Sequence, residues 1–200
     1  MTKPLIVGRP ALIVVDIQQG AFMPDPGGGG IPIMADVATR FHRARTLVDA
    51  ARSAGVPLVF IQEAHRPDHV DFGRELDGTE DVHCVEGDPR TEIAVEIGMR
   101  PSDYFIKKRR YSAFFGTDLE ILLKGLKAET LILVGGLTDV CVHYTFVDAH
   151  QHDYHVRVVE DCVAGSSEAA HTASLNAMEY LQTGARRSAA DVFGAFAQRA

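Results

Sequence analysis

The sequence predicts an α/β protein in which helices cover both faces of a mainly parallel central sheet, giving three layers (α/β/α). Two observations support this fold class. First, short apolar runs rich in β-branched residues are sharply bounded at 11–15, 57–61, 131–134 and 156–159, with a weaker run at 104–106. Such near-continuous apolar runs suit strands that are covered on both faces. Second, segments with helical periodicity lie between them, and strands that alternate with helices form parallel sheets.

Four segments carry the helical pattern. Residues 33–54 place apolar side chains at three- and four-residue intervals, and Gly55 is a natural stop after them. The sequence "TDLE" at 117–120 fits a capping box with a leucine stripe behind it. Residues 140–150 and 167–181 also have a helical pattern. The first three segments each lie between two predicted strands, and the fourth follows the last one.

Composition limits the classes of function. The chain has 200 residues, of which 46% are hydrophobic, and we expect one domain over 1–200. Its formal net charge of −7 argues against a binder of nucleic acid or anionic membranes, because either would need a basic face. No stretch reaches the roughly 20 apolar residues that span a bilayer, and the N-terminus lacks the shape of a signal peptide. Three widely spaced cysteines favour free thiols in a reducing compartment, so we expect a cytoplasmic protein.

Chemically capable side chains follow the ends of three predicted strands. Asp16 follows the first strand, Lys107 and Lys108 follow the weak one, and Cys141 follows the strand at 131–134. In open α/β sheets, ligands bind beyond the carboxyl ends of the strands, so we expect these side chains to converge. Each alone has a commoner structural explanation, as a turn former, a solvated lysine or a buried cysteine. Together they indicate a nucleophile and its partners.

The chemistry that these residues suggest is nucleophilic catalysis. A thiolate is the reactive form of cysteine, and a helix N-terminus or a neighbouring cation lowers the thiol pKa from about 8.5. Cys141 stands at the start of a predicted helix, and Lys108 would supply the cation. Asp16 would take the thiol proton and return it to a leaving amine. Gly135 and Gly136 let the backbone turn so that N–H groups face the reacting carbonyl oxygen.

Four segments match one known family in order: "ALIVVDIQ", "KRRYSAFFGTDLEILL", "LILVGGLTDVCVHYTFVDA" and "VRVVEDCVAGS". They resemble the isochorismatase-like cysteine hydrolases, which include N-carbamoylsarcosine amidohydrolase, biuret, triuret and ureidoacrylate hydrolases and, more distantly, nicotinamidases. The resemblance covers nearly the whole chain and implies the isochorismatase-like α/β/α fold. It also implies a catalytic triad of Asp16, Lys108 and Cys141. Lys108 is preferred to Lys107 because it lies three residues before Tyr111.

The resemblance further implies how the site works. A cis peptide would join Gly136 to Leu137, and the N–H groups of Leu137 and Cys141 would form the oxyanion hole. The thiolate would attack an amide or ureido carbonyl, Asp16 would protonate the leaving ammonia, and water would release the acid. Relatives that hydrolyse the vinyl ether of isochorismate keep the aspartate but lack the cysteine, so Cys141 favours a carbon–nitrogen bond. A vinyl-ether hydrolase acting through Asp16 alone is one alternative, and a binding protein or redox-sensing thiol on the same fold is another.

Candidate substrate contacts are Phe22, His65, Tyr111 and Tyr144. The family carries an aromatic residue five positions after the aspartate, whereas here that position is Ala21 and Phe22 follows it. The expected partner is a small amide or ureido compound; biuret, triuret and N-carbamoyl acids all remain open. Arg66, Arg74 and Arg109 are the candidates to hold a substrate carboxylate. The resemblance also suggests a homo-oligomer, as a dimer or tetramer.

Nicotinamidases bind a metal through an Asp-x-His pair and a later histidine, which correspond here to Glu63, His65 and His83. A carboxylate with two histidines suits a divalent ion. However, glutamate replaces aspartate, and the interval from Lys108 to Cys141 resembles that of the metal-free ureido hydrolases. We therefore expect no metal and no cofactor, with a metal-assisted nicotinamidase as the alternative.

Two loops stand out in the predicted fold. Residues 63–90 form a long polar segment with several histidines, and loops of that length in compact domains are usually functional. The glycine-rich segment at 23–30 lacks the spacing of a dinucleotide-binding motif, and we interpret it as a mobile flap over the site.

Overall fold

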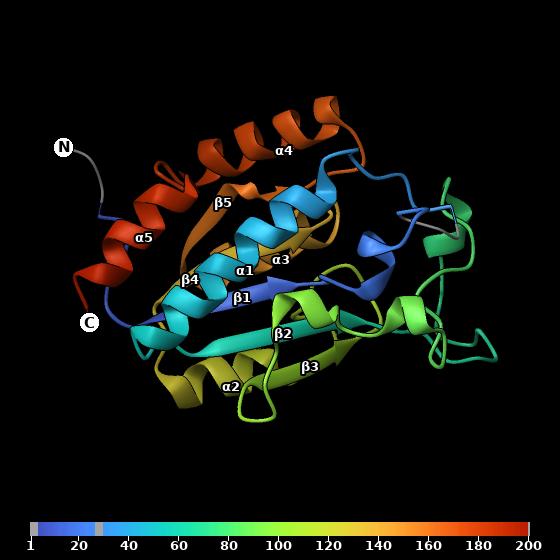
Figure 1. Ribbon diagram of the computed structural model, residues 1–200, viewed down its shortest axis with the longest axis horizontal. Helices are drawn as coiled ribbons and strands as arrows, with labels where there is room; N and C mark the ends of the chain where they lie inside the picture. Colours follow the sequence, from blue (N-terminus) through green and yellow to red (C-terminus); the bar gives the residue numbers. More distant parts are fainter. Residues whose placement is uncertain (1–3, 27–29, 200) are drawn as a thin grey trace.

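The computed structural model describes residues 4–26 and 30–199 (Figure 1). Its centre is a sheet in the order β3-β2-β1-β4-β5-β6, in which every pair of neighbouring strands is parallel. The strands are β1 (Pro10–Val15), β2 (Leu58–Glu63), β3 (Tyr104–Lys108), β4 (Thr130–Gly136), β5 (His155–Ala164) and β6 (Arg186–Arg187). The five predicted strands are present, and the short β6 extends the sheet beyond them.

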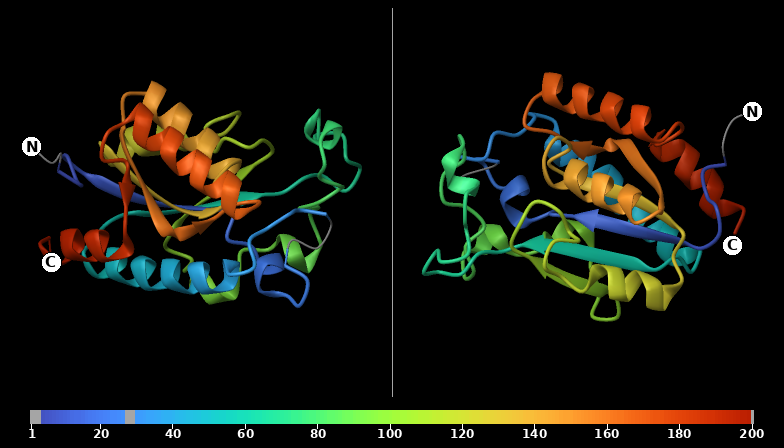
Figure 2. Two further views of the ribbon diagram at one scale, coloured as in Figure 1. Left: turned by 90° about the horizontal axis from the view of Figure 1, so that it is seen from above. Right: turned by 180° about the vertical axis from the view of Figure 1, so that it is seen from behind.

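Helices cover both faces of this sheet, which confirms the three-layer prediction. Figure 2 shows α1 and α5 on one face and α3 and α4 on the other. The α-helices are α1 (Val37–Ser53), α2 (Leu119–Leu126), α3 (Cys141–Gln151), α4 (Glu168–Leu181) and α5 (Ala189–Ala197). Short 3-10 turns are η1 (Gln19–Phe22), η2 (Glu75–Asp77), η3 (Pro89–Thr91) and η4 (Val95–Ile97). Of the α-helices, α5 was not predicted.

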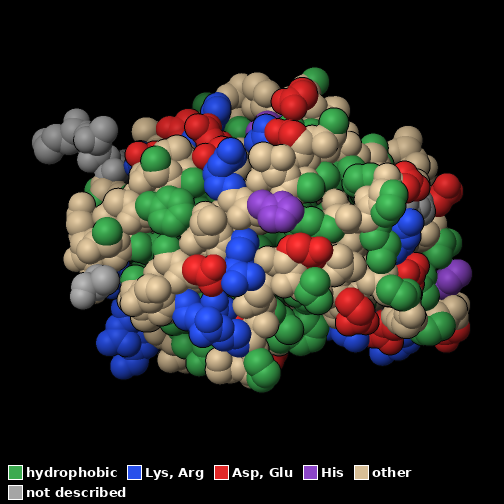
Figure 3. All heavy atoms as spheres, in the orientation of Figure 1, with side chains coloured by type: hydrophobic (Ala, Val, Ile, Leu, Met, Phe, Trp, Pro, Cys, Tyr) green, Lys and Arg blue, Asp and Glu red, His purple; other side chains and the backbone are tan. Residues whose placement is uncertain are grey.

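Each face of the sheet has its own hydrophobic core. Phe41 of α1 and Phe196 of α5 pack in the first core, with one set of strand side chains. Leu123 of α2 and Phe146 of α3 pack in the second core, with the alternate strand side chains. Because β1 and β4 are buried over their whole length, their apolar runs are nearly continuous rather than alternating. Acidic and basic side chains are mixed over the face shown in Figure 3, and among the described residues no helix is long and apolar enough to cross a membrane.

The starts of two helices differ from the predictions. The predicted capping box at 117–120 is wrong: Asp118 is the N-cap of α2 and makes no side-chain cap hydrogen bond. The Thr117 hydroxyl oxygen instead accepts a hydrogen bond from the Leu119 N–H at 3.2 Å, within the turn before the helix. Helix α1 begins at Val37 rather than at residue 33: residues 31–34 have no regular secondary structure, and the Met34 N–H donates to the carbonyl of Gly165. Of the predicted glycine-rich flap, residues 27–29 lie outside the described residues.

The turn after β4 depends on glycine. Gly135 has φ of +119°, and a Cβ there would lie 1.9 Å from the carbonyl oxygen of Val15 on β1. An alanine therefore fits neither the backbone conformation nor the space. The next peptide, Gly136–Leu137, is cis, as the family resemblance implied.

Candidate active site

The ends of four elements bring the candidate residues together. Asp16 directly follows β1, Glu63 ends β2, Lys108 ends β3, and Cys141 is the first residue of α3. The parallel register pairs Glu63 with Lys108 as neighbours across the sheet. The convergence predicted for Asp16, Lys108 and Cys141 is therefore present, and Glu63 joins it.

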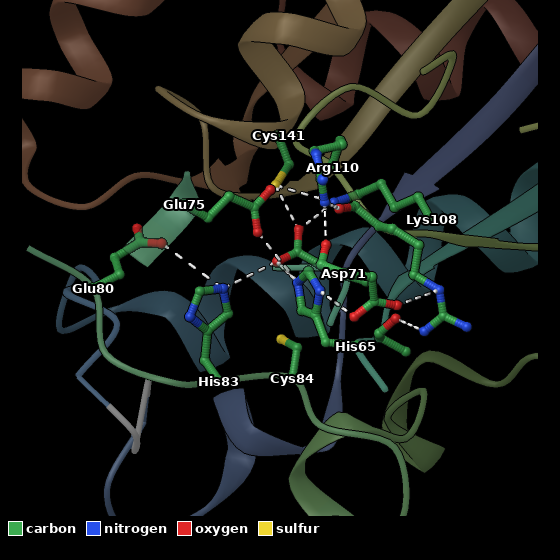
Figure 4. Close-up of polar contacts among 12 residues, drawn as sticks. His65, Asp71, Glu75, Glu80, His83, Cys84, Lys108, Arg110 and Cys141 are labelled. Atoms are coloured by element: carbon green, nitrogen blue, oxygen red, sulfur yellow. Dashed lines mark hydrogen bonds and ion pairs between the residues drawn. The ribbon is translucent and has the colours of Figure 1, made fainter. Parts of the chain in front are cut away.

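Lys108 is the centre of this group. Its Nζ lies 2.9 Å from Asp16 Oδ2 and 3.3 Å from Cys141 Sγ, and it also forms an ion pair with Glu63. Its side chain has 0% exposure. Figure 4 shows the Lys108 and Cys141 side chains directed toward each other. Lys107, in contrast, points outward and pairs with Glu86 at 3.0 Å.

The direction of the Cys141 pKa shift differs from the sequence prediction. Burial raises the pKa of the Cys141 thiol well above its usual value. Lys108 opposes this shift, but Glu63 and Asp16 add to it. The Cys141 thiol donates a hydrogen bond to Glu63 Oε2 at 3.3 Å. Lys108 lowers the thiol pKa as predicted, but the predicted net direction is wrong, because it left out burial and a second carboxylate, which raise the pKa more.

The two carboxylates beside Lys108 differ in proton affinity. Burial raises the pKa of Asp16 to about 6, with Lys108 opposing and Glu63 reinforcing the shift. Burial would also raise the pKa of Glu63, but Lys108, His65 and His83 outweigh it and hold this pKa well below its usual value. Of the pair, Asp16 is thus the group that can exchange a proton near neutral pH.

A cavity of about 310 Å³ opens onto these groups. Asp16, Glu63 and Cys141 reach its wall, together with Gly136 and Leu137 of the turn before α3. The cavity is within the size range of small-molecule sites. Any ligand in it would contact the thiol and the segment predicted to form the oxyanion hole.

Of the four predicted substrate contacts, Tyr111 lines the cavity and the other three do not. Tyr144 is 51% exposed and stacks on Tyr111 with ring centroids 5.6 Å apart, so it lies behind the wall. His65 is fully buried and stacks on Phe72. The predicted wall position of Phe22 is wrong.

The cavity wall near η1 has other residues instead of Phe22. Phe22 packs against Phe41 and His42, with ring centroids 6.3 and 5.2 Å away. Ala21, at the position where the family has its aromatic residue, and Phe41 line the cavity. The aromatic side chain of this wall therefore comes from α1.

Four buried residues form a second polar cluster behind Glu63. Glu63 Oε1 lies 3.1 Å from His83 Nε2 and 3.5 Å from His65 Nε2, and His65 Nε2 lies 3.2 Å from Glu75 Oε2. One ligand atom from each of the four lies within 4.8 Å of the others. Two carboxylates and two imidazoles suit a divalent ion such as zinc, so these residues fit the metal that the distant relatives imply.

Protonated imidazoles would also place positive charge beside the carboxylates of this cluster. His83 has its Nδ1 2.6 Å from the carbonyl oxygen of Asp81 and its Nε2 beside Glu63, so both nitrogens face acceptors. Burial would lower the pKa of His65, but Glu63 and Glu75 outweigh it and raise the value to about 9. The sequence analysis missed Glu75 because this residue lies in a short 3-10 turn of the long 63–90 segment and belongs to no motif.

The three arginines considered for a substrate carboxylate are engaged elsewhere. Arg66 pairs with Asp71, and Arg109 pairs with Asp71 and Glu86. Arg74 is highly exposed and pairs with Asp77. None of the three lines the described cavity wall.

Comparisons with known proteins give the family. The isochorismatase domain model matches residues 10–191. A maleamate amidohydrolase of Pseudomonas putida is 30% identical over 172 residues, covering 84% of this chain and 78% of the relative. A ureidoacrylate amidohydrolase of Yersinia enterocolitica is 32% identical over 174 residues, covering 76% of this chain and 73% of the relative.

Solved structures agree with this assignment. N-carbamoylsarcosine amidase from Thermoplasma acidophilum superposes with a TM-score of 0.76 at 27% identity, over 91% of this chain and 97% of that one. Pyrazinamidase of Pyrococcus horikoshii, in complex with zinc, has a TM-score of 0.75 at 28% identity, over 87% and 96%. The chain belongs to the isochorismatase family of hydrolases.

Proposed function

We propose that this hydrolase is a cysteine-dependent amidohydrolase that cleaves a carbon–nitrogen bond of a small ureido or amide compound, of the biuret, triuret or N-carbamoyl type. The observation that carries the proposal is the position of Cys141. Its sulfur reaches the wall of a cavity, lies 3.3 Å from Lys108 Nζ, and shares this ammonium with two carboxylates. Two relatives that are at least 30% identical are named as amidohydrolases, which supports the same reaction class.

The first step removes the proton from the buried thiol. Both Asp16 and Glu63 are near the sulfur, but a general base works best when its pKa lies near the working pH. The pKa of Asp16 is about 6, whereas that of Glu63 is held well below its usual value. We therefore assign the base to Asp16 and a positioning role to Glu63. Lys108 stabilises the thiolate as it forms.

The second step is attack of the thiolate on the carbonyl carbon of the substrate. The N–H groups of Leu137 and Cys141 are assigned to the oxyanion, in the turn that contains the cis peptide. Asp16 returns its proton to the leaving nitrogen, and ammonia departs while the acyl group remains on Cys141 as a thioester. A water molecule, deprotonated by Asp16, then hydrolyses the thioester and restores the thiol.

Ammonia release from ureido compounds, carbamoyl amino acids and nicotinamide tests the proposal. We expect Cys141→Ala to lower kcat/KM at least about a thousandfold, because removing a nucleophile removes the covalent route. Cys162→Ala is the matched control, since Cys162 is buried in the core that contains α1. Rapid quenching of the wild-type reaction should give a mass increase on Cys141 equal to the acyl group. Full activity of the Cys141 variant would contradict the proposal and favour a vinyl-ether hydrolase acting through Asp16.

A metal-assisted amidase is the second candidate, because Glu63, His65, Glu75 and His83 lie together. When bound there, a divalent ion would act as a Lewis acid that polarises a carbonyl oxygen. Elemental analysis and the melting temperature with and without added zinc test this candidate. Zinc should raise the melting temperature of the wild type, and should not raise that of His83→Ala, because a ligand that binds the folded state stabilises it. Stoichiometric metal with nicotinamide turnover would favour this candidate over the metal-free enzyme.

The proposal includes the setting in which the enzyme works. We propose a cytoplasmic homo-oligomer, a dimer or tetramer, with no nucleic-acid or membrane partner. Light scattering of the purified protein gives the number of subunits, and a monomer would contradict this part.

A further inference from the structure

Arg90 is the one arginine or lysine on the described wall of the cavity that Cys141 reaches. It lies in η3, and its Nη1 donates a hydrogen bond to the backbone carbonyl of Asp25 at 3.0 Å. Among residues 4–26 and 30–199, the guanidinium makes no other hydrogen bond and no ion pair. A guanidinium has five N–H donors in a planar fork, so most of these donors remain for a ligand.

The backbone that carries Arg90 is held by buried hydrogen bonds. The Thr91 carbonyl accepts from the side-chain amides of Gln18 at 2.7 Å and Gln62 at 2.8 Å. On the other side, Asp88 caps the turn, because its Oδ1 accepts from the Arg90 N–H at 2.8 Å. The two glutamines come from the ends of β1 and β2, the strands that also carry the carboxylates beside the thiol. A cation whose backbone is already fixed loses less freedom when it binds a ligand.

The acidic groups of the same wall leave the guanidinium available. Asp25 and Asp88 are exposed, so solvent and salt screen their charge, and neither carboxylate forms an ion pair with the guanidinium. Glu80 has His83 as an ion-pair partner at 3.9 Å. The two carboxylates beside the thiol are paired with Lys108, which is fully buried. A ligand with a negative end would therefore find one accessible cation on the described wall.

A carboxylate is the anion that suits a single guanidinium. Its two oxygens can accept two parallel N–H bonds from the planar fork, and such charge-assisted pairs are stronger than neutral hydrogen bonds. Its one negative charge also equals the charge of Arg90. A phosphate dianion would keep one negative charge without a partner, because the described wall has no second arginine or lysine.

From this arrangement we infer that Arg90 determines specificity by binding a carboxylate of the substrate while the scissile bond lies at Cys141. The inference rests on the proposed function for the scissile bond. It narrows the substrates of that proposal to N-carbamoyl acids, since biuret and triuret carry no carboxylate.

Three compounds of matched length test the inference: the monocarbamoyl derivatives of β-alanine, aminopropanol and diaminopropane. They carry a negative, a neutral and a positive end. We expect kcat/KM to be at least about tenfold higher for the acid than for either of the others, because only the acid forms a charge-assisted pair with the guanidinium. Equal rates, or a preference for the neutral or the ammonium compound, would overturn the inference.

Substitution at Arg90 locates the effect. Arg90→Gln should raise KM for the acid at least about fivefold and leave kcat unchanged, because the lost interaction is present in both ground and transition states. KM for the neutral compound should change little, which shows that the cavity is intact. Arg90→Lys should fall between the two, since it keeps the charge and loses the planar fork.

Arg74→Gln is the matched control, because Arg74 is highly exposed and lies outside the cavity wall. It should leave all three profiles unchanged. Persistence of the acid preference in Arg90→Gln, or its loss in Arg74→Gln, would contradict the assignment.

Binding to the Cys141→Ala variant separates this inference from the proposed function, because calorimetry with the same three compounds does not require turnover. The wild type could hydrolyse none of them while the variant binds the acid at least about tenfold more tightly than the others, and loses this preference when Arg90→Gln is added. The carboxylate site then stands, and the reaction assignment fails for ureido compounds. If the variant binds all three alike, or binds none, the carboxylate site is overturned, whatever the wild type hydrolyses.

Discussion

Replacing Lys108 with methionine tests the electrostatic core of the site. The substitution keeps the length and most of the volume of the side chain but removes the ammonium. Lys108 Nζ lies 2.9 Å from Asp16 Oδ2 and also pairs with Glu63, with no exposure to solvent. In the variant, the buried Asp16 carboxylate would lose its cation, and Glu63 would keep only its histidine partners.

The expected loss of stability follows from these contacts. Removing one partner of a buried ion pair costs about 3–5 kcal/mol, because the remaining charge stays buried. Since the pKa of Asp16 is already about 6, that carboxyl can take up a proton and limit the loss. We therefore expect the free energy of unfolding to fall by about 3–5 kcal/mol at pH 7 and by less at pH 5. This is a large part of the 5–15 kcal/mol that is typical of a folded domain.

Urea unfolding followed by circular dichroism measures this change. Lys107→Met is the matched control, because Lys107 is 39% exposed and makes a surface ion pair that contributes at most about 1 kcal/mol. Adding Glu63→Gln to the Lys108 variant should restore at least about 1 kcal/mol, because one of the two carboxylates that lost the ammonium is then neutral. The reasoning is refuted if the Lys108 and Lys107 variants are equally stable.

Further predictions concern Asp16 and Gly135. The activity of the wild type should fall as the pH drops through about 6, because Asp16 must be ionised to accept the thiol proton; an acid limb near 4 in the pH profile of kcat/KM would speak against Asp16 as the base. Because the folded-state pKa of Asp16 lies above the unfolded value of 3.8, its ionisation costs stability as the pH rises between these values, so Asp16→Asn should be more stable than the wild type at pH 7, by at most about 3 kcal/mol in urea titrations. Gly135→Ala should abolish folding or lower the melting temperature by more than about 10 °C, because the new Cβ meets backbone. Gly125→Ala in α2 has open space and should stabilise the protein by about 0.5–1 kcal/mol; equal melting temperatures of the two variants would contradict the role of Gly135.

The sequence predicts the fold well where burial is uniform. The strands β1, β2, β4 and β5 have apolar runs because helices cover both faces of the sheet. The two-residue strand β6 has no such run, since Arg186 and Arg187 are both polar. Helix α5 was missed because it is short and Gly194 interrupts its apolar pattern. The capping box between Ser188 and Asp191 could have indicated where it begins.

The sequence predicts which site residues lie at the ends of strands, but it does not predict the contacts that depend on how neighbouring strands are aligned. Asp16, Lys108 and Cys141 could be placed on one edge because parallel strands end together. The contact between Glu63 and Lys108 depends on how β2 and β3 are aligned, which no local pattern encodes. The thiol pKa depends on burial and on that same carboxylate, so the sequence predicted its direction wrongly.

Glu63 connects the two polar clusters, and this connection constrains both. One oxygen faces Lys108 and Cys141, and the other faces His83 and His65. Positive charge at His65 and His83, from protons or a metal ion, would neutralise part of the negative charge of Glu63. Lys108 would then interact more strongly with the Cys141 sulfur. If that positive charge were lost, Lys108 would compensate Glu63 alone, and less of its charge would stabilise a thiolate at Cys141. We therefore expect the histidine cluster to act on the proposed nucleophile, Cys141, through one carboxylate, although no contact joins His65 or His83 to the thiol.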